Sequence, residues 1–281
     1  MSVPPRFLRD DFARRWEGRD PFEQIAAVAT TPVREVARRK TFRFELDGVG
    51  YYAKVHRGVG WREIIKNWLV GKAPVLDASN EFRAATKLAQ VGLDTLQVAA
   101  FGVRGRNPAR RDSFLVTDEI TDTVTLEAYT LPWPDQPPEP QTKRALISKV
   151  ADVARAMHGA GVNHRDFYIC HLLLKNPHLL TPAGENVTLY VVDLHRAQLR
   201  SRVPRRWLVR DLGGLYYSTF DINLSRGDRL RFLSRYFQLP VRELLRRHRT
   251  LLDAVERRAT KLYAKAERNQ ILPRQLAKQR H

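Results

Sequence analysis

The sequence NHRDFYICHLLL, residues 163–174, places a histidine, an arginine, an aspartate and a second histidine among aromatic and aliphatic residues. A run with this apolar content otherwise predicts a buried strand. Buried polar groups are costly unless hydrogen bonds satisfy them. We therefore expect these side chains either to satisfy one another within a core or to serve a ligand.

The composition points to a folded protein with an anionic partner. The 281 residues suffice for one large domain or two lobes, and 43% of them are hydrophobic, which excludes a disordered chain. The formal charge is +19, and residues 201–281 alone contain 20 Lys and Arg against 7 Asp and Glu. Nucleic acid, an anionic membrane, sugar phosphates or an acidic protein would each match this charge.

Cysteine usage and hydropathy restrict the cellular compartment and the kind of membrane association that we expect. The single cysteine, Cys170, excludes an internal disulfide framework and a cysteine-based zinc site, as suits a reducing cytosol. The N-terminus lacks the apolar core of a signal peptide, and no segment approaches 18 consecutive apolar residues. We expect a soluble or peripheral protein that does not span a membrane.

The N-terminal part combines strands with helices. Residues 6–28 are predicted to be helical and loop-like. Strand-like runs follow, and the turn signal DGVG predicts an antiparallel meander; the runs cover residues 33–38, 41–46, 50–56, 96–103 and 113–118. Apolar residues at helical spacing predict one amphipathic helix in WREIIKNWLV, and a second helix covers about residues 79–90.

The C-terminal part reads as mainly helical. The proline-rich residues 131–141 are typical of a linker, and we place a boundary near residues 119–123. This predicts an α+β chain with a small antiparallel-sheet N-lobe, residues 1–120, and a larger helical C-lobe, residues 121–281. The order of sheet, helix, HRD motif and strand-terminal aspartate is that of the protein-kinase-like two-lobe fold.

Phosphoryl transfer requires cations for the triphosphate, and several residues are candidates. Lys54 on the third strand is predicted to reach the phosphates, with Glu81 as its partner and Glu63 as the alternative. No glycine-rich loop is present, and the turn between the first two strands offers Arg39 and Lys40, either as a phosphate clamp or as an exposed basic turn. The hinge would be Asp118, Glu119 and Ile120, with backbone groups for adenine.

The same chemistry needs a base and metal ligands. Asp166 occupies the base position of the HRD pattern, and Asp193 matches the strand-terminal aspartate that binds Mg2+. The residue five positions after Asp166, normally asparagine, is His171. Mg2+ prefers oxygen ligands, so a histidine is a poor replacement for the asparagine. His171 is therefore expected to contact either a phosphate or a single metal ion; the alternative is a histidine buried in the core. His164 and Asp211 are read as structural, with Asp211 receiving backbone N–H groups of the catalytic loop.

Three stretches carry a family resemblance: residues 51–82, residues 163–174 and VVDLHRA at residues 191–197. Together they resemble the lipopolysaccharide core heptose(I) kinases of Gram-negative bacteria, over roughly residues 20–220. The resemblance implies phosphorylation of O-4 of the first heptose on heptosyl-Kdo-lipid A, with ATP and Mg2+, by an enzyme peripheral to the cytoplasmic face of the inner membrane. Kdo kinases and heptose(II) kinases share this plan and stay open as alternatives.

The acceptor implied by the resemblance is a glycolipid that carries phosphates and carboxylates, which would account for the positive charge. Its candidate contacts are Arg57, Arg62, Lys66, Arg165 and Arg196. An anionic membrane surface is an expected partner and an acidic protein a possible one. Nucleic acid is not expected, because the basic C-terminal region shows no recognisable nucleic-acid-binding motif. A protein kinase acting on Ser, Thr or Tyr, and a non-catalytic basic binding module, are the remaining alternatives.

Overall fold

The computed structural model describes residues 4–29, 34–36, 39–69, 74–180 and 187–269. The chain forms two compact units. The first comprises residues 1–86, 96–120 and 194–196, and the second comprises residues 87–95, 121–193 and 197–281. The main change from the first unit to the second therefore falls after Ile120, while residues 87–95 and 194–196 each belong to the opposite unit from their neighbours in sequence.

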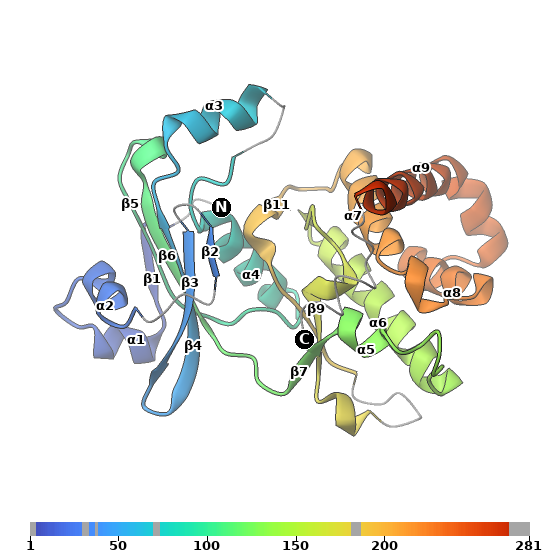
Figure 1. The fold of residues 1–281 in the computed structure, drawn as a ribbon, viewed down its shortest axis with the longest axis horizontal. Helices are drawn as coiled ribbons and strands as arrows, with labels where there is room; N and C mark the ends of the chain where they lie inside the picture. The colour runs from blue at the N-terminus through green and yellow to red at the C-terminus, as the bar shows by residue number, and fades with distance from the viewer. Residues whose placement is uncertain (1–3, 30–33, 37–38, 70–73, 181–186, 270–281) are drawn as a thin grey trace. The chain divides into compact units, whose positions relative to one another are not determined.

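The first unit is built on a six-stranded antiparallel sheet with the order β1-β5-β6-β4-β3-β2 (Figure 1). Its strands are β1 (Arg6–Leu8), β2 (Arg34–Val36), β3 (Arg39–Leu46), β4 (Val49–Arg57), β5 (Val98–Arg104) and β6 (Asp112–Asp118). Between β3 and β4, Asp47 and Gly48 have φ angles of 51° and 77°, the backbone that a tight two-residue hairpin requires. The predicted antiparallel meander is confirmed.

Helices cover both faces of this sheet. Helices α1 (Asp10–Arg15) and α2 (Pro21–Ala27) pack on one face, where Phe12, Trp16 and Ile25 join a buried cluster with β-strand residues such as Phe114. On the other face, Phe82 of helix α4 (Ser79–Gln90) stacks on Phe101 at a centroid distance of 4.3 Å. Strands between two helical layers are buried on both faces, and β6 accordingly buries five consecutive residues, 113–117.

Two predictions for the first unit are wrong in detail. Residues 6–28 contain the edge strand β1 as well as helices, because three residues are too few to show an alternating pattern. Arg39 and Lys40, predicted in the turn, belong to β3, where they pair with Val36 and Glu35. The ladder thus extends to the pair Val36 and Arg39. Residues 37–38, between them in sequence, lie outside the described residues.

The second unit is mainly helical. Its helices are α5 (Leu126–Thr130), α6 (Pro140–Gly159), α7 (Arg205–Tyr217), α8 (Arg226–Phe237) and α9 (Val241–Arg268). Its short strands are β7 (Thr123–Thr125), β8 (Val162–Asn163), β9 (Leu172–Lys175), β10 (Leu189–Val191) and β11 (Gln198–Leu199). Helix α6 packs against α8, and α7 packs against α9. Helix α9 buries Leu244, Leu251 and Val255.

An antiparallel sheet unit followed by a mainly helical unit is a protein-kinase-like fold, so the predicted fold class is confirmed. The proline-rich residues 131–141, predicted as a linker, lie inside the second unit instead. Trp133 within them is buried, which ties the segment to the helical core. Among the helices of the described ranges, none combines the length and the apolarity needed to cross a bilayer.

Candidate active site

A buried ion pair joins β4 to α4 in the first unit. Lys54 Nζ donates to Glu81 Oε1 at 2.5 Å. Glu81 is 1% exposed, and the ammonium is the partner that offsets the cost of burying its carboxylate. The sequence alternatives for Lys54 were Glu81 and Glu63, and Glu63 instead lies exposed on helix α3 (Trp61–Leu69).

Arg39 of β3 lies near this pair. Arg39 Nη2 donates to the Val75 carbonyl at 3.1 Å, and burial lowers the pKa of its guanidinium against the opposing influence of Glu63 and Glu81. Burial first, and then Arg39, lowers the pKa of His56 to about 4. His56 is therefore neutral near pH 7. Lys40, which follows Arg39 on β3, is exposed.

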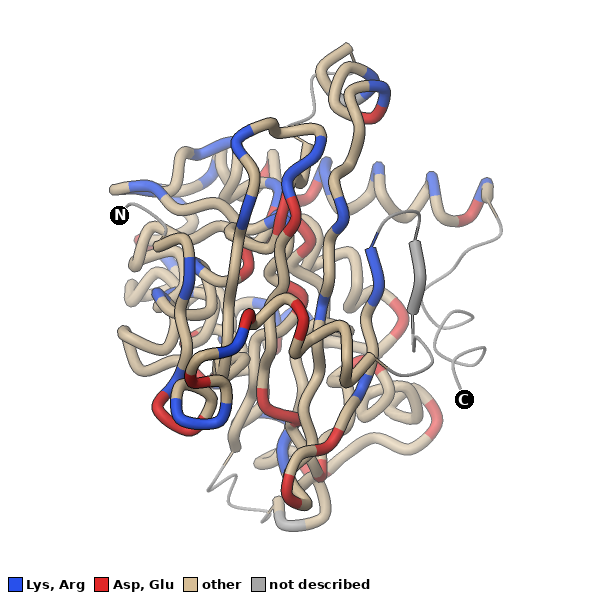
Figure 2. The backbone as a smooth tube through the Cα atoms, turned by 90° about the vertical axis from the view of Figure 1, so that its left-hand side faces the viewer, with Lys and Arg blue, Asp and Glu red and all other residues tan. Residues whose placement is uncertain are grey.

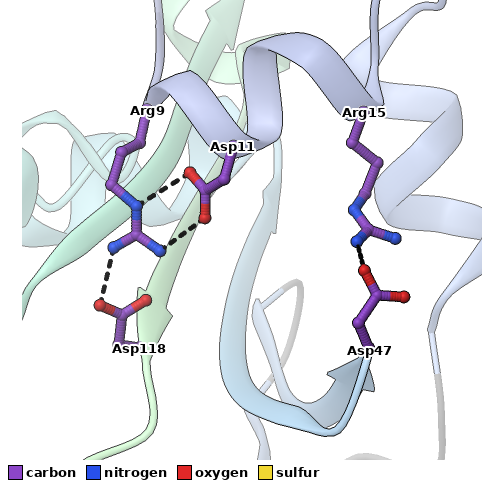
Figure 3. Close-up of polar contacts among 5 residues, drawn as sticks. All are labelled: Arg9, Asp11, Arg15, Asp47 and Asp118. Carbon is purple, nitrogen blue, oxygen red and sulfur yellow. Dashed lines mark hydrogen bonds and ion pairs between the residues drawn. The ribbon is translucent and has the colours of Figure 1, made fainter.

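The predicted hinge, residues 118–120, is tied into the sheet. The N–H groups of Asp118 and Glu119 donate to the carbonyls of Gln97 and Gly50, each at 3.0 Å. These two donors are therefore not available to adenine. Figure 3 shows the Asp118 carboxylate held by Arg9, whose guanidinium also chelates Asp11.

The same close-up shows how the N-terminal extension is attached. Arg15 of α1 pairs with Asp47 in the β3–β4 turn, while the Arg9 fork spans α1 and the end of β6. The hydrogen bond from Arg9 lowers the pKa of Asp11. The helices at the N-terminus thus reinforce the end of the sheet that carries the hinge segment.

In the second unit, Asp211 of α7 holds the loop that carries the HRD motif. Its side chain is 0% exposed, and its two oxygens accept the N–H groups of His164 and Arg165, both at 2.7 Å. Arg165 has a φ angle of 75°, a strained backbone for a residue other than glycine. The interpretation of Asp211 as a buried receiver of loop N–H groups is confirmed. His164, also 0% exposed, bonds the Val192 carbonyl at 3.0 Å, as expected for a structural residue.

Asp166 follows this strained residue and is held from two sides. Arg210 Nε donates to the Arg165 carbonyl at 2.7 Å, and its Nη2 lies 3.5 Å from Asp166 Oδ1. His171 Nδ1 lies 2.7 Å from the Asp166 carbonyl oxygen. Because a carbonyl only accepts, Nδ1 carries the proton. The base position is therefore fixed by both neighbours.

This tautomer has a consequence for Asp193. In a neutral ring, His171 Nε2 carries a lone pair, yet it lies 3.4 Å from Asp193 Oδ2. Two electron-rich atoms this close need either a proton on Nε2 or a cation beside them. Asp193 adopts a φ angle of 61°, a strained backbone of the kind that clusters at functional sites.

The donor set fits a hard cation only in part. The Asp193 carboxylate is a suitable Mg2+ ligand, whereas the His171 imidazole is a weaker one. Within the described ranges, no group of three or more His, Cys, Asp or Glu side chains is placed to hold a metal. Mg2+ commonly takes one or two protein carboxylates and completes its shell with phosphates and water, so Asp193 suits a nucleotide-dependent site.

The five predicted acceptor contacts differ from one another in exposure and in their place in the fold. Arg57, Arg62 and Lys66 are exposed at the end of β4 and along α3. Arg165 is 6% exposed, which leaves little of its side chain for a sugar. Arg196 lies in the turn Leu194–Arg196 of the first unit and is half-buried.

Sequence reasoning missed the residues that support the loop from α6, α7 and α8. They are His158, Arg210 and Tyr236. His158 Nε2 lies 3.3 Å from Asp211 Oδ2, and His158 Nδ1 lies 2.8 Å from the Tyr236 hydroxyl oxygen, so the histidine links the two residues. Arg210 precedes Asp211 in sequence, and this adjacency was the available signal; the other two sit among ordinary helix residues.

Comparison with known proteins agrees with this geometry. Residues 23–236 match the lipopolysaccharide kinase (Kdo/WaaP) family. The chain belongs to this family. Membership of a kinase family makes it an enzyme that transfers phosphate to an alcohol group, and it implies the use of ATP. The family resemblance predicted from the sequence is confirmed.

Individual members of the family are similar over nearly their whole length. The chain is 48% identical to the lipopolysaccharide core heptose(I) kinase WaaP of Pseudomonas aeruginosa, covering 93% of this chain and 97% of that protein. It is 46% identical to the Escherichia coli WaaP, covering 91% and 96%. A solved structure described as WaaP in complex with acyl carrier protein is 43% identical, covers 92% of this chain and 99% of that chain, and superposes with a TM-score of 0.80.

The Asp211 network yields a stability prediction. Asp211→Asn places an amide N–H against a backbone N–H, so we expect the free energy of unfolding to fall by about 2–4 kcal/mol. Urea denaturation followed by circular dichroism measures this. The matched control is Asp253→Asn, an exposed aspartate of the same unit, for which we expect a change within about 0.5 kcal/mol. Equal stabilities of the two variants would contradict the role of Asp211.

Proposed function

We propose that this protein is a lipopolysaccharide core heptose(I) kinase, which uses ATP and Mg2+ to phosphorylate O-4 of the first heptose of heptosyl-Kdo-lipid A. The observation that carries the proposal is the 48% identity to a heptose(I) kinase over nearly the full length of both chains. The second support is Asp166, held beside Arg210 and His171 in a loop anchored by a buried carboxylate.

In the proposed reaction, the heptose hydroxyl attacks the γ-phosphorus of ATP. A new O–P bond forms, the bond from phosphorus to the bridging β-phosphate oxygen breaks, and the hydroxyl proton passes to the Asp166 carboxylate. Arg210 and His171 hold Asp166 in position from its side chain and its backbone. Lys54, oriented by Glu81, contacts the α- and β-phosphates. Mg2+, held by Asp193 and beside His171, would supply positive charge to the phosphate oxygens.

The other nucleotide contacts follow from the first unit. Arg39 and Lys40 lie near the start of β3, close in sequence to the turn that replaces a glycine-rich loop. We assign them to the phosphates as side-chain cations. Adenine would use carbonyl oxygens of residues 118–120, since the N–H groups of Asp118 and Glu119 are engaged.

The acceptor is a lipid, so the proposal includes a membrane surface, at the cytoplasmic face of the inner membrane. Helix α3 is suited to it. Ile64 is 1% exposed and anchors the helix, whereas Trp61, Ile65, Trp68 and Leu69 are 48–82% exposed. On a helical projection these four residues share one arc, and Arg62 and Lys66 border it. Exposed tryptophans beside basic residues are typical of helices that lie in an anionic lipid interface.

The surrounding surface has the matching charge. The backbone of Gly58 and Gly60 is bonded to Arg111 and Ala109, which brings the loop of residues 105–111 next to the start of α3. Arg57, Arg106 and Arg110 in these segments are exposed. Figure 2 shows Lys and Arg positions gathered at the end of the sheet from which α3 projects. We therefore propose that the apolar arc of α3 binds an anionic bilayer.

The solved relative bound to acyl carrier protein suggests a protein partner as well. The second unit contains an apolar cavity of about 420 Å³ between α6, α7, α8 and α9, lined by residues such as Trp133, Leu146 and Val150. Arg226 and Arg249 are exposed members of its lining. We propose that an acylated, acidic carrier protein inserts its acyl chain here and pairs with these arginines.

The first prediction from the proposed function concerns the base. Asp166→Ala is expected to lower turnover on heptosylated Kdo-lipid A by about 10²- to 10⁴-fold while leaving ATP affinity within about twofold. Transfer from labelled ATP measures turnover, and the position of the phosphate on the product distinguishes O-4 of heptose(I) from a Kdo or heptose(II) site. No transfer to the heptose by the folded wild-type protein, or near-normal turnover of the variant, would refute the assignment.

The second prediction concerns α3. Trp68→Ser with Leu69→Ser is expected to weaken sedimentation with phosphatidylglycerol vesicles roughly tenfold or more, because burial of these side chains contributes about 1.5–3 kcal/mol each. Turnover on a water-soluble, O-deacylated acceptor should not change. Val49→Ser, which changes an exposed apolar residue at the start of β4, is the matched control. Equal vesicle binding by both variants, or a dimer that the double substitution dissolves, would contradict a lipid occupant.

The third prediction concerns the cavity. Arg226→Glu with Arg249→Glu should weaken binding of acylated carrier protein roughly tenfold or more, as expected for the loss of close charge pairs. Arg242→Glu on the exposed face of α9 is the control. Isothermal titration calorimetry with acylated and unacylated carrier measures both effects. If the acyl group made no difference to affinity, the cavity would not be its site.

A further inference from the structure

An unusual cluster of arginines surrounds Trp207, at the start of α7. The guanidinium carbons of Arg165, Arg200, Arg206 and Arg210 lie 5.3, 5.6, 5.6 and 5.8 Å from the centre of its ring. Each contact to the ring is favourable by about 0.5–2 kcal/mol. Like charges this close repel one another. The Asp166 carboxylate lies 3.5 Å from Arg210, so the need for an added anion falls on Arg200 and Arg206.

The contacts of Arg200 and Arg206 do not provide one. Arg200 donates to the side-chain carbonyls of Asn163 at 2.6 Å and Gln198 at 2.8 Å, both neutral. Arg206 is exposed. In the part of the chain that the structure describes, neither forms an ion pair with a carboxylate. Burial, and secondarily the charge of Arg206, lowers the pKa of Arg200, which is the response of a cation that lacks a counterion.

The backbone at the same place points in the same direction. Helix α7 has 13 residues, its N-cap Pro204 provides no side-chain hydrogen bond, and its first turn has no acidic residue. Acidic side chains normally favour this end of a helix, and Arg205 and Arg206 stand there instead. Arg205 donates to the Thr250 carbonyl at 2.8 Å, while Arg206, which is also exposed, has its guanidinium over the Trp207 ring.

We propose that Arg206, Arg200 and the N-terminal turn of α7 form a binding site for an anionic group of the acceptor, a phosphate or a sugar carboxylate. Arg210 links this site to the base, since it contacts both the Trp207 ring and the Asp166 carboxylate. The site would therefore hold the glycolipid on the unit that carries Asp166. This inference rests on the proposed function for the identity of the acceptor, and it adds the group by which the acceptor is held.

The test compares Arg206→Gln with Arg144→Gln, an exposed arginine of α6. Three O-deacylated acceptors are used. The first is heptosyl-Kdo-lipid A with all its anionic groups, called the intact acceptor; the second lacks the lipid A phosphates, and the third has its Kdo carboxylates esterified. For the intact acceptor, Arg206→Gln should raise KM roughly tenfold with kcat unchanged, since a charge-assisted hydrogen bond is lost in ground and transition states alike. KM for ATP should not change in either variant.

The modified acceptors identify the anion. On the compound that lacks the recognised group, KM of the wild-type protein should rise by the same factor. On that compound, Arg206→Gln should not raise KM any further. A phosphate source and a carboxylate source thus give opposite patterns, and either pattern supports the site. Equal KM values for the two variants on the intact acceptor, or an equal loss for Arg206→Gln on all three compounds, would overturn it.

A binding measurement separates this inference from the proposed function. Isothermal titration calorimetry of the intact acceptor without ATP should show weaker binding to Arg206→Gln than to Arg144→Gln, and the difference should shrink as salt is raised. This holds whether or not phosphate is transferred. Absence of transfer by the wild-type protein would refute the heptose kinase assignment, whereas unaltered acceptor binding by Arg206→Gln would refute the anion site.

Discussion

The carboxylate of Asp211 is the constraint on which the second unit depends. It is fully buried, and it accepts two loop N–H groups at 2.7 Å each. A buried carboxylate has to be satisfied, and those donors are available only if the loop turns through the strained backbone of Arg165, at a φ angle of 75°. That turn determines where the next residue, Asp166, points.

Helix α7 therefore positions the site from two consecutive residues. Asp211 accepts from the loop backbone, and Arg210 donates to the Arg165 carbonyl and lies beside Asp166. His171 closes the arrangement from the other side, because one ring contacts the Asp166 backbone and the Asp193 carboxylate. A histidine in place of the usual asparagine thus links Asp166 and Asp193, the proposed base and the proposed metal ligand, through one side chain.

The excess positive charge is organised into separate surfaces. The exposed residues of α3 combine cations with large apolar side chains, as a lipid interface would require. The cluster around Trp207 combines cations with an aromatic ring and an uncapped helix end, which suits a compact anion. Arg226 and Arg249 border an apolar cavity. One net charge of +19 is thus compatible with several different anionic partners.

The sequence by itself determined the fold class, the family and the order of the candidate residues, because turn signals, helical periodicity and short motifs act over a few neighbouring positions. Asp211 was also interpreted from the sequence as a structural carboxylate that receives backbone N–H groups of the loop, and the structure confirms this. The pairing of Lys54 with Glu81 rather than Glu63 needed the tertiary structure, because both glutamates lie on helices that follow β4 and only the fold shows that Glu81 is buried against Lys54 while Glu63 is exposed. The same is true of Trp207, whose arginines come from positions 165 to 210 and converge only when β8, β11 and α7 pack together. Convergence of residues distant in sequence is decided by packing, and no local pattern records it.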